Sequence, residues 1–213
     1  YENTMEKGMI SGWTAATIST SGNVGDNWTS IDALDMDKDG DIDVLSGYAS
    51  SIVWHTNNGS QSFTTNTISN SQGANSLYGV DMDKDGDVDV VTSLIGDDKV
   101  AWYENNGSQS YIKNILSNDD AGGAQIYPVD IDKDGDMDVL SAGGGWGNTI
   151  KWYNNNGSQS FSVSTLYTAS SNSANLRGVY AIDLDRDGDM DILSVQSHYE
   201  HKVFWLKNNG SQS

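Results

Sequence analysis

The sequence predicts an all-β fold: a β-propeller made of four tandem, four-stranded antiparallel blades, each with an acidic loop between two of its strands. Three observations lead to this fold class. An aspartate-rich motif begins at Asp35, Asp81, Asp130 and Asp183, in steps of 46, 49 and 53 residues, and a period of this length indicates stacked supersecondary units. Each unit holds four short segments rich in β-branched and aromatic residues, which is typical of a propeller blade. No segment keeps a helical apolar period, so we expect little helix.

The four strands of a unit follow in a fixed order. The first precedes the acidic motif, the second follows it, the third carries a tryptophan, and the fourth comes after an Asn-Asn-Gly-Ser-Gln-Ser motif. Asn-Gly between two apolar segments favours a tight hairpin, because both residues tolerate a positive φ. We expect first strands at 30–34, 77–80, 126–129 and 179–182, second strands at 44–46, 90–92, 139–141 and 192–194, and fourth strands such as 63–68 and 161–166. The third strands carry Trp54, Trp102, Trp152 and Trp205.

A single repeat domain over residues 1–213 is predicted, with approximate repeats at 10–57, 63–106, 111–155 and 161–208. The first residues, Tyr1-Glu2-Asn3, match Tyr103-Glu104-Asn105 just after the tryptophan of the second repeat. Both ends are therefore expected to be cut inside a repeat. This pattern predicts self-association or contact with neighbouring repeats, as in a larger repeat protein or a filament.

The composition limits the classes of partner. The chain is 36% hydrophobic and 9% aromatic, which is enough to form a buried core. Its formal net charge of −19 predicts no nucleic-acid partner, because phosphates would be repelled. No apolar run approaches the roughly 20 residues that a membrane-spanning helix needs, so we expect no membrane span.

The acidic loop has the composition of a metal site. Counted from its first aspartate, positions 1, 3, 5, 7 and 9 are aspartate in every repeat, and position 6 is glycine. Alternating carboxylates on a tight turn point at one centre, the glycine lets the backbone turn sharply, and the carbonyl of position 7 can add a ligand. Oxygen ligands of mixed type suit Ca²⁺, whereas Mg²⁺ prefers a stricter octahedron and soft metals prefer Cys or His. The sequence therefore predicts about four calcium ions, one in each repeat.

The residues between the aspartates are patterned too. Positions 2 and 8 are apolar in each loop and are expected to hold it against the core. Position 4 is always basic and is expected to point to solvent; the residues are Lys38, Lys84, Lys133 and Arg186.

Two alternative interpretations of the loop are weaker. An EF-hand needs flanking helices and a glutamate at position 12, whereas the flanks here are predicted strands. Position 12 is occupied by Ser46, Thr92, Ser141 and Ser194. A solvated acidic turn without a metal is the other alternative, and it would leave strong repulsion among the carboxylates of each loop.

The whole chain resembles the FG-GAP/VCBS repeat family. The resemblance rests on Asp-x-Asp-x-Asp-Gly-x-x-Asp between two strands, followed by a Trp-Tyr-x-Asn-Asn-Gly strand such as 102–107. It implies a β-propeller of the integrin α-subunit type, usually seven-bladed, with Ca²⁺ in the blade hairpins. The implied ligands are the aspartates at positions 1, 3, 5 and 9: Asp35, Asp37, Asp39 and Asp43; Asp81, Asp83, Asp85 and Asp89; Asp130, Asp132, Asp134 and Asp138; Asp183, Asp185, Asp187 and Asp191. The position 7 carbonyls of Asp41, Asp87, Asp136 and Asp189 complete the set.

Other candidate sites are less specific. The histidines His55, His198 and His201 lack zinc-protease spacing and are expected to be ordinary surface residues. The repeat tryptophans are expected to pack between blades, with sugar stacking as the alternative. The tryptophans outside the repeat are better candidates for ligand contact; these are Trp13, Trp28 and Trp146. Asn-Gly-Ser sequons at Asn58, Asn106, Asn156 and Asn209 fit either turn chemistry or glycosylation.

Two functions are consistent with these patterns. The first is an extracellular or cell-surface calcium-binding β-propeller, secreted by a bacterium, with a structural, adhesive or assembly role. The second is a carbohydrate-binding, lectin-like module or the non-catalytic domain of a polysaccharide-active enzyme. No catalytic pair is predicted, because the carboxylates of each cluster are taken up by the cation.

Overall fold

The structure, a computed structural model, describes residues 14–19, 30–70, 73–94, 99–116, 123–143, 148–170, 175–197 and 201–210. In these ranges the chain forms fifteen β-strands and no helix, as the sequence predicts. Accordingly, the described residues contain no helix with the length and apolarity needed to cross a membrane.

The strands form four antiparallel sheets in chain order. The first sheet contains β1 (Ser30–Leu34), β2 (Asp43–Gly47), β3 (Ile52–Asn57) and β4 (Phe63–Ser69). The second contains β5 (Ala74–Val80), β6 (Asp89–Leu94), β7 (Val100–Asn105) and β8 (Tyr111–Ile115). The third contains β9 (Gly123–Val129), β10 (Asp138–Gly143), β11 (Thr149–Asn155) and β12 (Phe161–Thr168). The fourth contains β13 (Leu176–Ile182), β14 (Asp191–Gln196) and β15 (Lys202–Leu206).

Each sheet is a meander in which consecutive strands pair. Four-stranded sheets are therefore confirmed for the first three units, while the fourth has three strands within the described residues. The sheets are offset by one strand from the approximate repeats, since β8 at 111–115 belongs to the same sheet as β5–β7. The tryptophan strand is the third strand of every sheet, as predicted.

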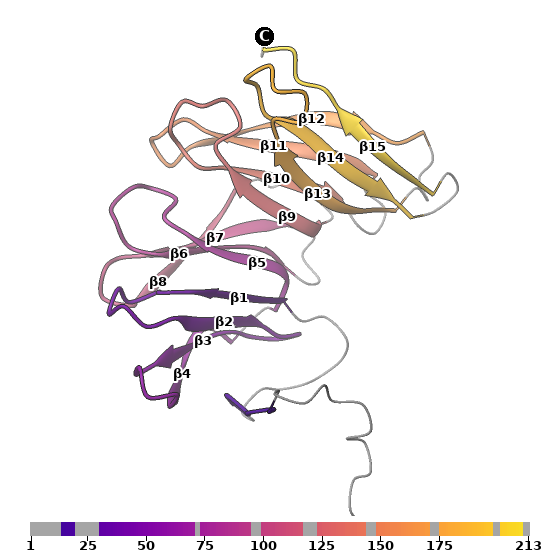
Figure 1. Cartoon of the computed structure of the whole chain (residues 1–213). Coiled ribbons are helices and arrows are strands. Elements are labelled where there is room, and N and C mark those ends of the chain that lie inside the picture. Colours follow the sequence, from indigo (N-terminus) through magenta and orange to yellow (C-terminus); the bar gives the residue numbers. More distant parts are fainter. Residues whose placement is uncertain are drawn as a thin grey trace, which may run out of the picture.

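The four sheets stack face to face in an open arc that does not close into a ring (Figure 1). Neighbouring sheets meet most closely along their first strands, in the order β1, β5, β9 and β13. The residue two places before each acidic motif is small or compact, which fits this crowding; the four residues are Ala33, Gly79, Pro128 and Ala181. A Cβ placed on Gly79 of β5 would lie 2.5 Å from Leu34 Cδ1, at the end of β1.

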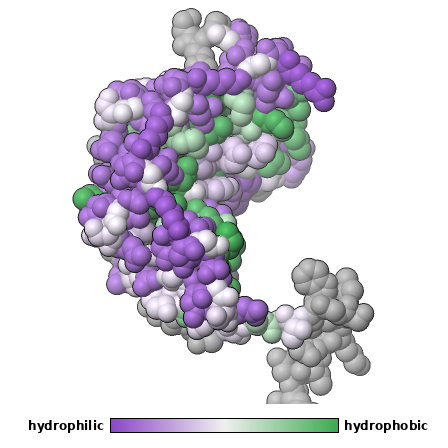
Figure 2. Space-filling view, turned by 60° about the vertical axis from the view of Figure 1, so that its left-hand side comes forward, coloured by the Kyte–Doolittle hydropathy of each residue, from purple (hydrophilic) through white to green (hydrophobic). Residues whose placement is uncertain are grey.

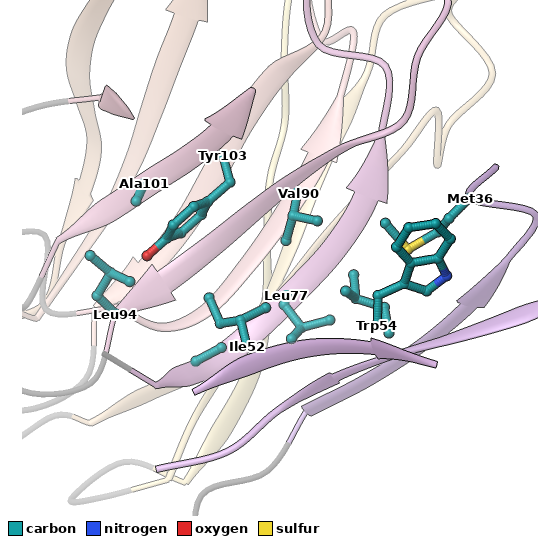
Figure 3. Packing of buried hydrophobic residues seen from close by; sticks show 10 residues of the cluster. Met36, Ile52, Trp54, Leu77, Val90, Leu94, Ala101 and Tyr103 are labelled. Carbon is teal, nitrogen blue, oxygen red and sulfur yellow. The ribbon is translucent and has the colours of Figure 1, made fainter. Parts of the chain in front are cut away.

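The core consists of three apolar layers, each between two successive sheets. In the first layer Trp54 and Ile52 of β3 face Leu77 of β5 and Val90 of β6 (Figure 3). Trp102 repeats the role of Trp54 between the second and third sheets, and Trp152 packs against the layer between the third and fourth. The packing interpretation is thus confirmed for these three tryptophans. Trp205 differs, because no fifth sheet lies beyond it in the described chain and it is 41% exposed.

An internal tryptophan and the last tryptophan of this series give a matched test of the stacking. Trp102→Ala empties a site that is 2% exposed, so we expect it to lower the free energy of unfolding by about 3–5 kcal/mol. Trp205→Ala removes a side chain that is not enclosed, and should cost about 1 kcal/mol or less. Urea unfolding of dilute protein in calcium checks both values, and equal losses would contradict the stacking.

Candidate metal centres

Each acidic loop joins the first two strands of a sheet, so the fold places four equivalent loops along the same edge of the sheet stack. In the first sheet the loop is closed by the pairing of Leu34 with Asp43. The second, third and fourth loops close in the same way, at Val80–Asp89, Val129–Asp138 and Ile182–Asp191. Strands on both sides confirm that the loop is not an EF-hand.

The aspartates at positions 1, 3 and 5 fold inward on backbone N–H groups. In the second loop Asp81 accepts a hydrogen bond from the N–H of Gly86 at 3.1 Å, Asp83 from that of Asp85 at 3.2 Å, and Asp85 from that of Asp87 at 2.7 Å. The same three bonds recur in the other loops. Each of these carboxylates therefore has one oxygen held by the loop backbone. At position 3 the other oxygen also has a partner in three loops: Asp83 accepts from Gln159 Nε2, Asp132 accepts from Asn154 Nδ2, and Asp185 lies against Lys207.

The first aspartate of every loop carries the clearest sign of a missing partner. Its Oδ2 accepts the glycine N–H, but its Oδ1 is buried and accepts no hydrogen bond; the four residues are Asp35, Asp81, Asp130 and Asp183. A buried charged oxygen without a partner is costly. The same unpaired atom recurs in all four loops, each of which holds a group of aspartates that could bind a metal ion.

The structure brings most of the predicted ligand sets together. Ligand atoms of positions 1, 3 and 5 lie within 4.8 Å of one another in three loops. These groups are Asp35, Asp37 and Asp39; Asp81, Asp83 and Asp85; Asp183, Asp185 and Asp187. In the third loop the group is Asp130, Asp132 and Asp138, so position 9 takes the place of Asp134. Ligand roles for the other position 9 aspartates, for Asp134 and for the position 7 carbonyls stay predictions.

The aspartate at position 9 also holds the loop to the rest of its sheet. Asp43 is fully buried; its Oδ2 accepts hydrogen bonds from the N–H of Met36 at 3.1 Å and from Trp54 Nε1 at 2.9 Å, and its Oδ1 accepts from the N–H of Asn57 at 2.7 Å. The bonds from the position 2 and asparagine N–H groups recur in all four sheets. Position 9 thus ties the loop to the turn after the tryptophan strand.

The sequence analysis did not predict that the Asn-Asn-Gly-Ser motif, besides forming a turn, also binds the acidic loop. The first asparagine closes the link, because the Nδ2 of Asn57 donates to the carbonyl of Ile42 at 3.1 Å. Its equivalents at Asn105, Asn155 and Asn208 donate to the corresponding position 8 carbonyls at 3.2 Å. The sequence did contain a signal for this contact, because the acidic motif and the Asn-Asn-Gly-Ser motif recur in the same order in every repeat.

The backbone of the loop is left-handed at two positions. The glycine at position 6 has φ between 95° and 100°, as the tight turn requires. Position 4 is also left-handed, with φ between 61° and 64°, although it is a lysine or arginine. Non-glycine residues adopt this region at a cost, so the hydrogen bonds around the turn must hold it there.

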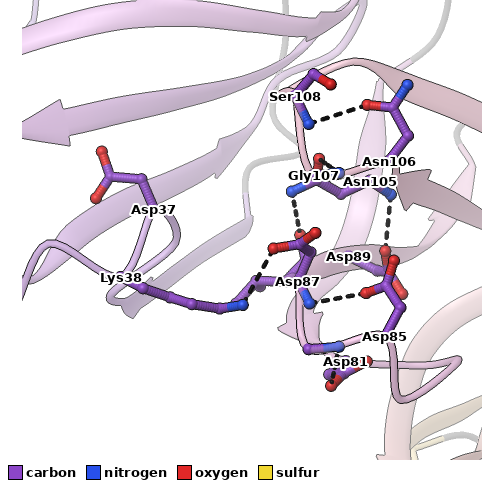
Figure 4. A network of polar contacts seen from close by, with 12 residues as sticks. Asp37, Lys38, Asp81, Asp85, Asp87, Asp89, Asn105, Asn106, Gly107 and Ser108 are labelled. Atoms are coloured by element: carbon purple, nitrogen blue, oxygen red, sulfur yellow. Dashed lines mark hydrogen bonds and ion pairs between the residues drawn. The ribbon is translucent and has the colours of Figure 1, made fainter.

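Lys38 and Lys84 at position 4 are exposed, as predicted, but each also forms an ion pair that the sequence did not predict. Lys38 Nζ lies 3.1 Å from the Oδ1 of Asp87, at position 7 of the next loop (Figure 4). Lys84 forms the same ion pair with Asp136. Each pair bridges successive sheets, which a pattern within one repeat cannot reveal.

The junction between the third and fourth sheets lacks this ion pair. Within the described residues Lys133 pairs with no aspartate, and Lys207 instead lies against Asp185 and 3.3 Å from Asp187. The pKa of Asp187 is lowered, first by the N–H of Asp189 and then by Lys207.

Burial opposes ionisation of four of the loop carboxylates. It raises the pKa of Asp89 to about 6, although backbone N–H donors act to lower it. The pKa of Asp138 is raised to about 6 for the same reason. The pKa values of Asp37 and Asp83 are also raised, by burial first and then by neighbouring aspartates. A bound divalent cation would oppose this shift, because an opposite charge favours the ionised form.

These features define a repeat protein of stacked β-sheets with an acidic loop in each unit. A model of the FG-GAP-like repeat family matches residues 35–92, 81–141 and 130–194, so the chain belongs to this family. The sequence-based resemblance is thereby confirmed.

The other comparisons inform the fold alone. No curated protein matches the chain. Among solved structures, the chain is similar to one from a study titled as the basis of specific recognition of non-reducing terminal N-acetylglucosamine by an Agrocybe aegerita lectin. The TM-score is 0.54 with 20% identity, and the match covers 85% of this chain and 52% of that one. The chain therefore spans about half the length of that protein.

The remaining sequence candidates fall in several places. Trp13, Trp28, Trp146 and His198 lie outside the described residues. His201 is exposed, as expected, but His55 is buried with its Nδ1 2.9 Å from Thr65 Oγ1, so its prediction as a surface residue is wrong. The sequon residues Asn58, Asn106, Asn156 and Asn209 lie on exposed turns.

The raised pKa values give a pH dependence for the calcium-free protein. Between the unfolded pKa of about 3.9 and the native value of about 6, Asp89 and Asp138 bind more protons in the native state. Their contribution to stability is therefore full below about pH 4 and is lost as the pH rises through 6. Urea unfolding of wild type and Asp138→Asn in calcium-free buffer should show the variant gaining on wild type between pH 4 and pH 7. A constant difference would contradict the shift.

Proposed function

We propose that the chain is an extracellular, calcium-binding β-propeller module with a structural, adhesive or assembly role, and that it is not an enzyme. The buried, unpaired Oδ1 of the first aspartate in each of four loops carries the proposal. Membership of the FG-GAP-like repeat family supports it, because the matched segments begin and end around these loops.

The residues of each loop fit calcium. Ca²⁺ takes six to eight oxygen ligands at about 2.3–2.6 Å in flexible geometry. Three aspartates already gather within 4.8 Å, and the donors are all hard oxygens. When bound, the ion would supply positive charge at the first aspartate and fix the hairpin. Asp81, Asp83 and Asp85 would hold it in the second loop, where backbone N–H groups bind one oxygen of each carboxylate. Asp83 Oδ2, which accepts from Gln159 Nε2, would exchange that hydrogen bond for the ion.

An extracellular location agrees with this chemistry. Extracellular calcium modules bind with dissociation constants of about 10⁻⁴–10⁻³ M, so their stability follows the calcium outside the cell. We further propose that the described arc is part of a propeller, whose closure needs more sheets than the four that the described residues form. A bacterial secreted or cell-surface setting is part of the same proposal.

Calcium titration tests the proposal directly. Wild type should bind about four ions in calorimetry, and calcium at about 100 times its dissociation constant should add about 2.7 kcal/mol per independent site. Asp81→Ala removes the unpaired oxygen and should bind one ion fewer. Asp87→Ala is the matched control, because it removes the ion pair with Lys38 but keeps the position 7 carbonyl. A melting temperature unchanged by calcium would contradict the proposal.

A second candidate is carbohydrate binding, favoured by a row of tyrosines on the first strands. The ring centroids of Tyr78 and Tyr127 lie 6.1 Å apart, and those of Tyr127 and Tyr180 lie 4.7 Å apart. Aromatic rings with a polar end suit sugar contact, and the fold neighbour is a lectin that recognises N-acetylglucosamine. A row of tyrosines on neighbouring strands also serves packing between sheets. It therefore supports carbohydrate binding less strongly than the acidic loops support calcium binding.

A glycan array separates the two candidates. If the tyrosine row binds sugar, wild type gives specific hits that Tyr180→Ala, at the exposed end of the row, weakens at least tenfold. Hits that persist in this variant and disappear in Trp13→Ala, Trp28→Ala or Trp146→Ala would place the site on those tryptophans. An array without hits would rule against the lectin candidate.

A further inference from the structure

The two ends of the sheet arc present apolar faces that no other sheet covers in the described chain. We call the face of the fourth sheet that turns away from the third the trailing face, and its exposed residues are Tyr180, Ile182, Leu184, Val195, Val203 and Trp205. We call the face of the first sheet that turns away from the second the leading face, with Ile31, Ala33 and Ile42 exposed. Repeat arrays usually end in polar capping faces, and these ends do not.

The residues of the trailing face occupy repeat positions whose equivalents are buried at the junctions between successive sheets. Val203 is 78% exposed, whereas its equivalents Ile52, Val100 and Ile150 are fully buried against the next sheet. Trp205 stands where Trp54 and Trp102 are buried. The position 2 residue shows the same contrast, because Leu184 is exposed and its equivalents in the other loops are buried. Figure 2 shows hydrophobic surface in the upper half of the molecule, where Figure 1 places β13 to β15.

The leading face has the complementary composition. Ile31 is 72% exposed, whereas Leu77 and Ile126 occupy its position in the next two sheets and are buried against the preceding sheet. Ile42 is exposed, whereas its equivalents Val88 and Met137 pack into the layers between sheets. Each internal junction joins one trailing-type face to one leading-type face.

The charges at the two ends match in the same way. At two internal junctions the position 4 lysine pairs with the position 7 aspartate of the following loop, as Lys38 does with Asp87. Asp41 at the leading end and Arg186 at the trailing end form no ion pair within the described residues. At a further junction of the same kind, Arg186 would be the basic partner and Asp41 the acidic partner of one more ion pair.

We infer that the trailing face binds the leading face of a second copy of this chain. Such a contact is heterologous, so it generates a closed ring or a filament according to the rotation between copies. Val203 and Trp205 of one copy pack on Ile31 and Ile42 of the next, and Arg186 pairs with Asp41. The inference rests on the proposed structural role and names its partner. Contiguous exposed apolar surface of this kind marks an interaction site.

Blocking each face separately tests the head-to-tail geometry. In sedimentation velocity with saturating calcium, wild type should form dimers or larger species that grow with concentration. Trp205→Glu blocks the trailing face and Ile31→Glu blocks the leading face, and each variant alone should be monomeric. A mixture of the two should give a one-to-one dimer, because one variant keeps the leading face and the other keeps the trailing face.

Ile112→Glu is the matched control, because Ile112 is 53% exposed on β8 and lies on neither terminal face. It should assemble as wild type does. A wild-type chain that stays monomeric at every concentration would overturn the inference, as would a mixture that fails to dimerise. Calcium stoichiometry measured on the same samples keeps the outcomes apart, since a calcium-bound monomer overturns only the assembly and a calcium-free oligomer overturns only the metal proposal.

Discussion

The crowding of carboxylates in the first hairpin of each sheet is the constraint on which the rest of the structure depends. Each loop places five aspartates in nine residues, and it folds because backbone N–H groups hold one oxygen of each at positions 1, 3 and 5. Those bonds arrange the charge but do not neutralise it. The buried Oδ1 of the first aspartate remains without a hydrogen-bond partner, and this is the observation on which the proposal of a bound divalent cation rests.

This local constraint extends across the sheet and then between sheets. Position 9 anchors the loop to the asparagine after the tryptophan strand, and position 4 reaches the next loop as an ion pair at two junctions. Exposed ion pairs contribute little stability, and the apolar layers between sheets supply most of the stabilisation. The two ion pairs instead link the loop edges of successive sheets. A cation that orders one loop would therefore also order the edge at which two sheets meet. Separately, a stack of such sheets is stable only where its apolar faces are covered.

Much of the fold could be predicted from the sequence, because the features that repeat are local. The Asp-x-Asp-x-Asp-Gly spacing, the Asn-Gly turn and the tryptophan strand each report on a few neighbouring residues, and all four sheets follow from them. The burial of His55, the bridge from Lys38 to Asp87 and the buried hydrogen bonds of Asp43 depend on contacts between strands or sheets. A pattern within one repeat carries no information on these contacts. The same limit applies to Trp205, whose sequence context matches that of Trp54 although its surroundings differ.

A crystal structure grown with calcium tests the central claim most directly, through anomalous scattering at the loops. We predict one ion in each loop at about 2.3–2.6 Å from the Oδ1 of Asp35, Asp81, Asp130 and Asp183, with no change in the backbone hydrogen bonds that hold Oδ2. Four ordered loops with this oxygen bonded only to water or protein, at a calcium concentration found outside cells, would contradict the account.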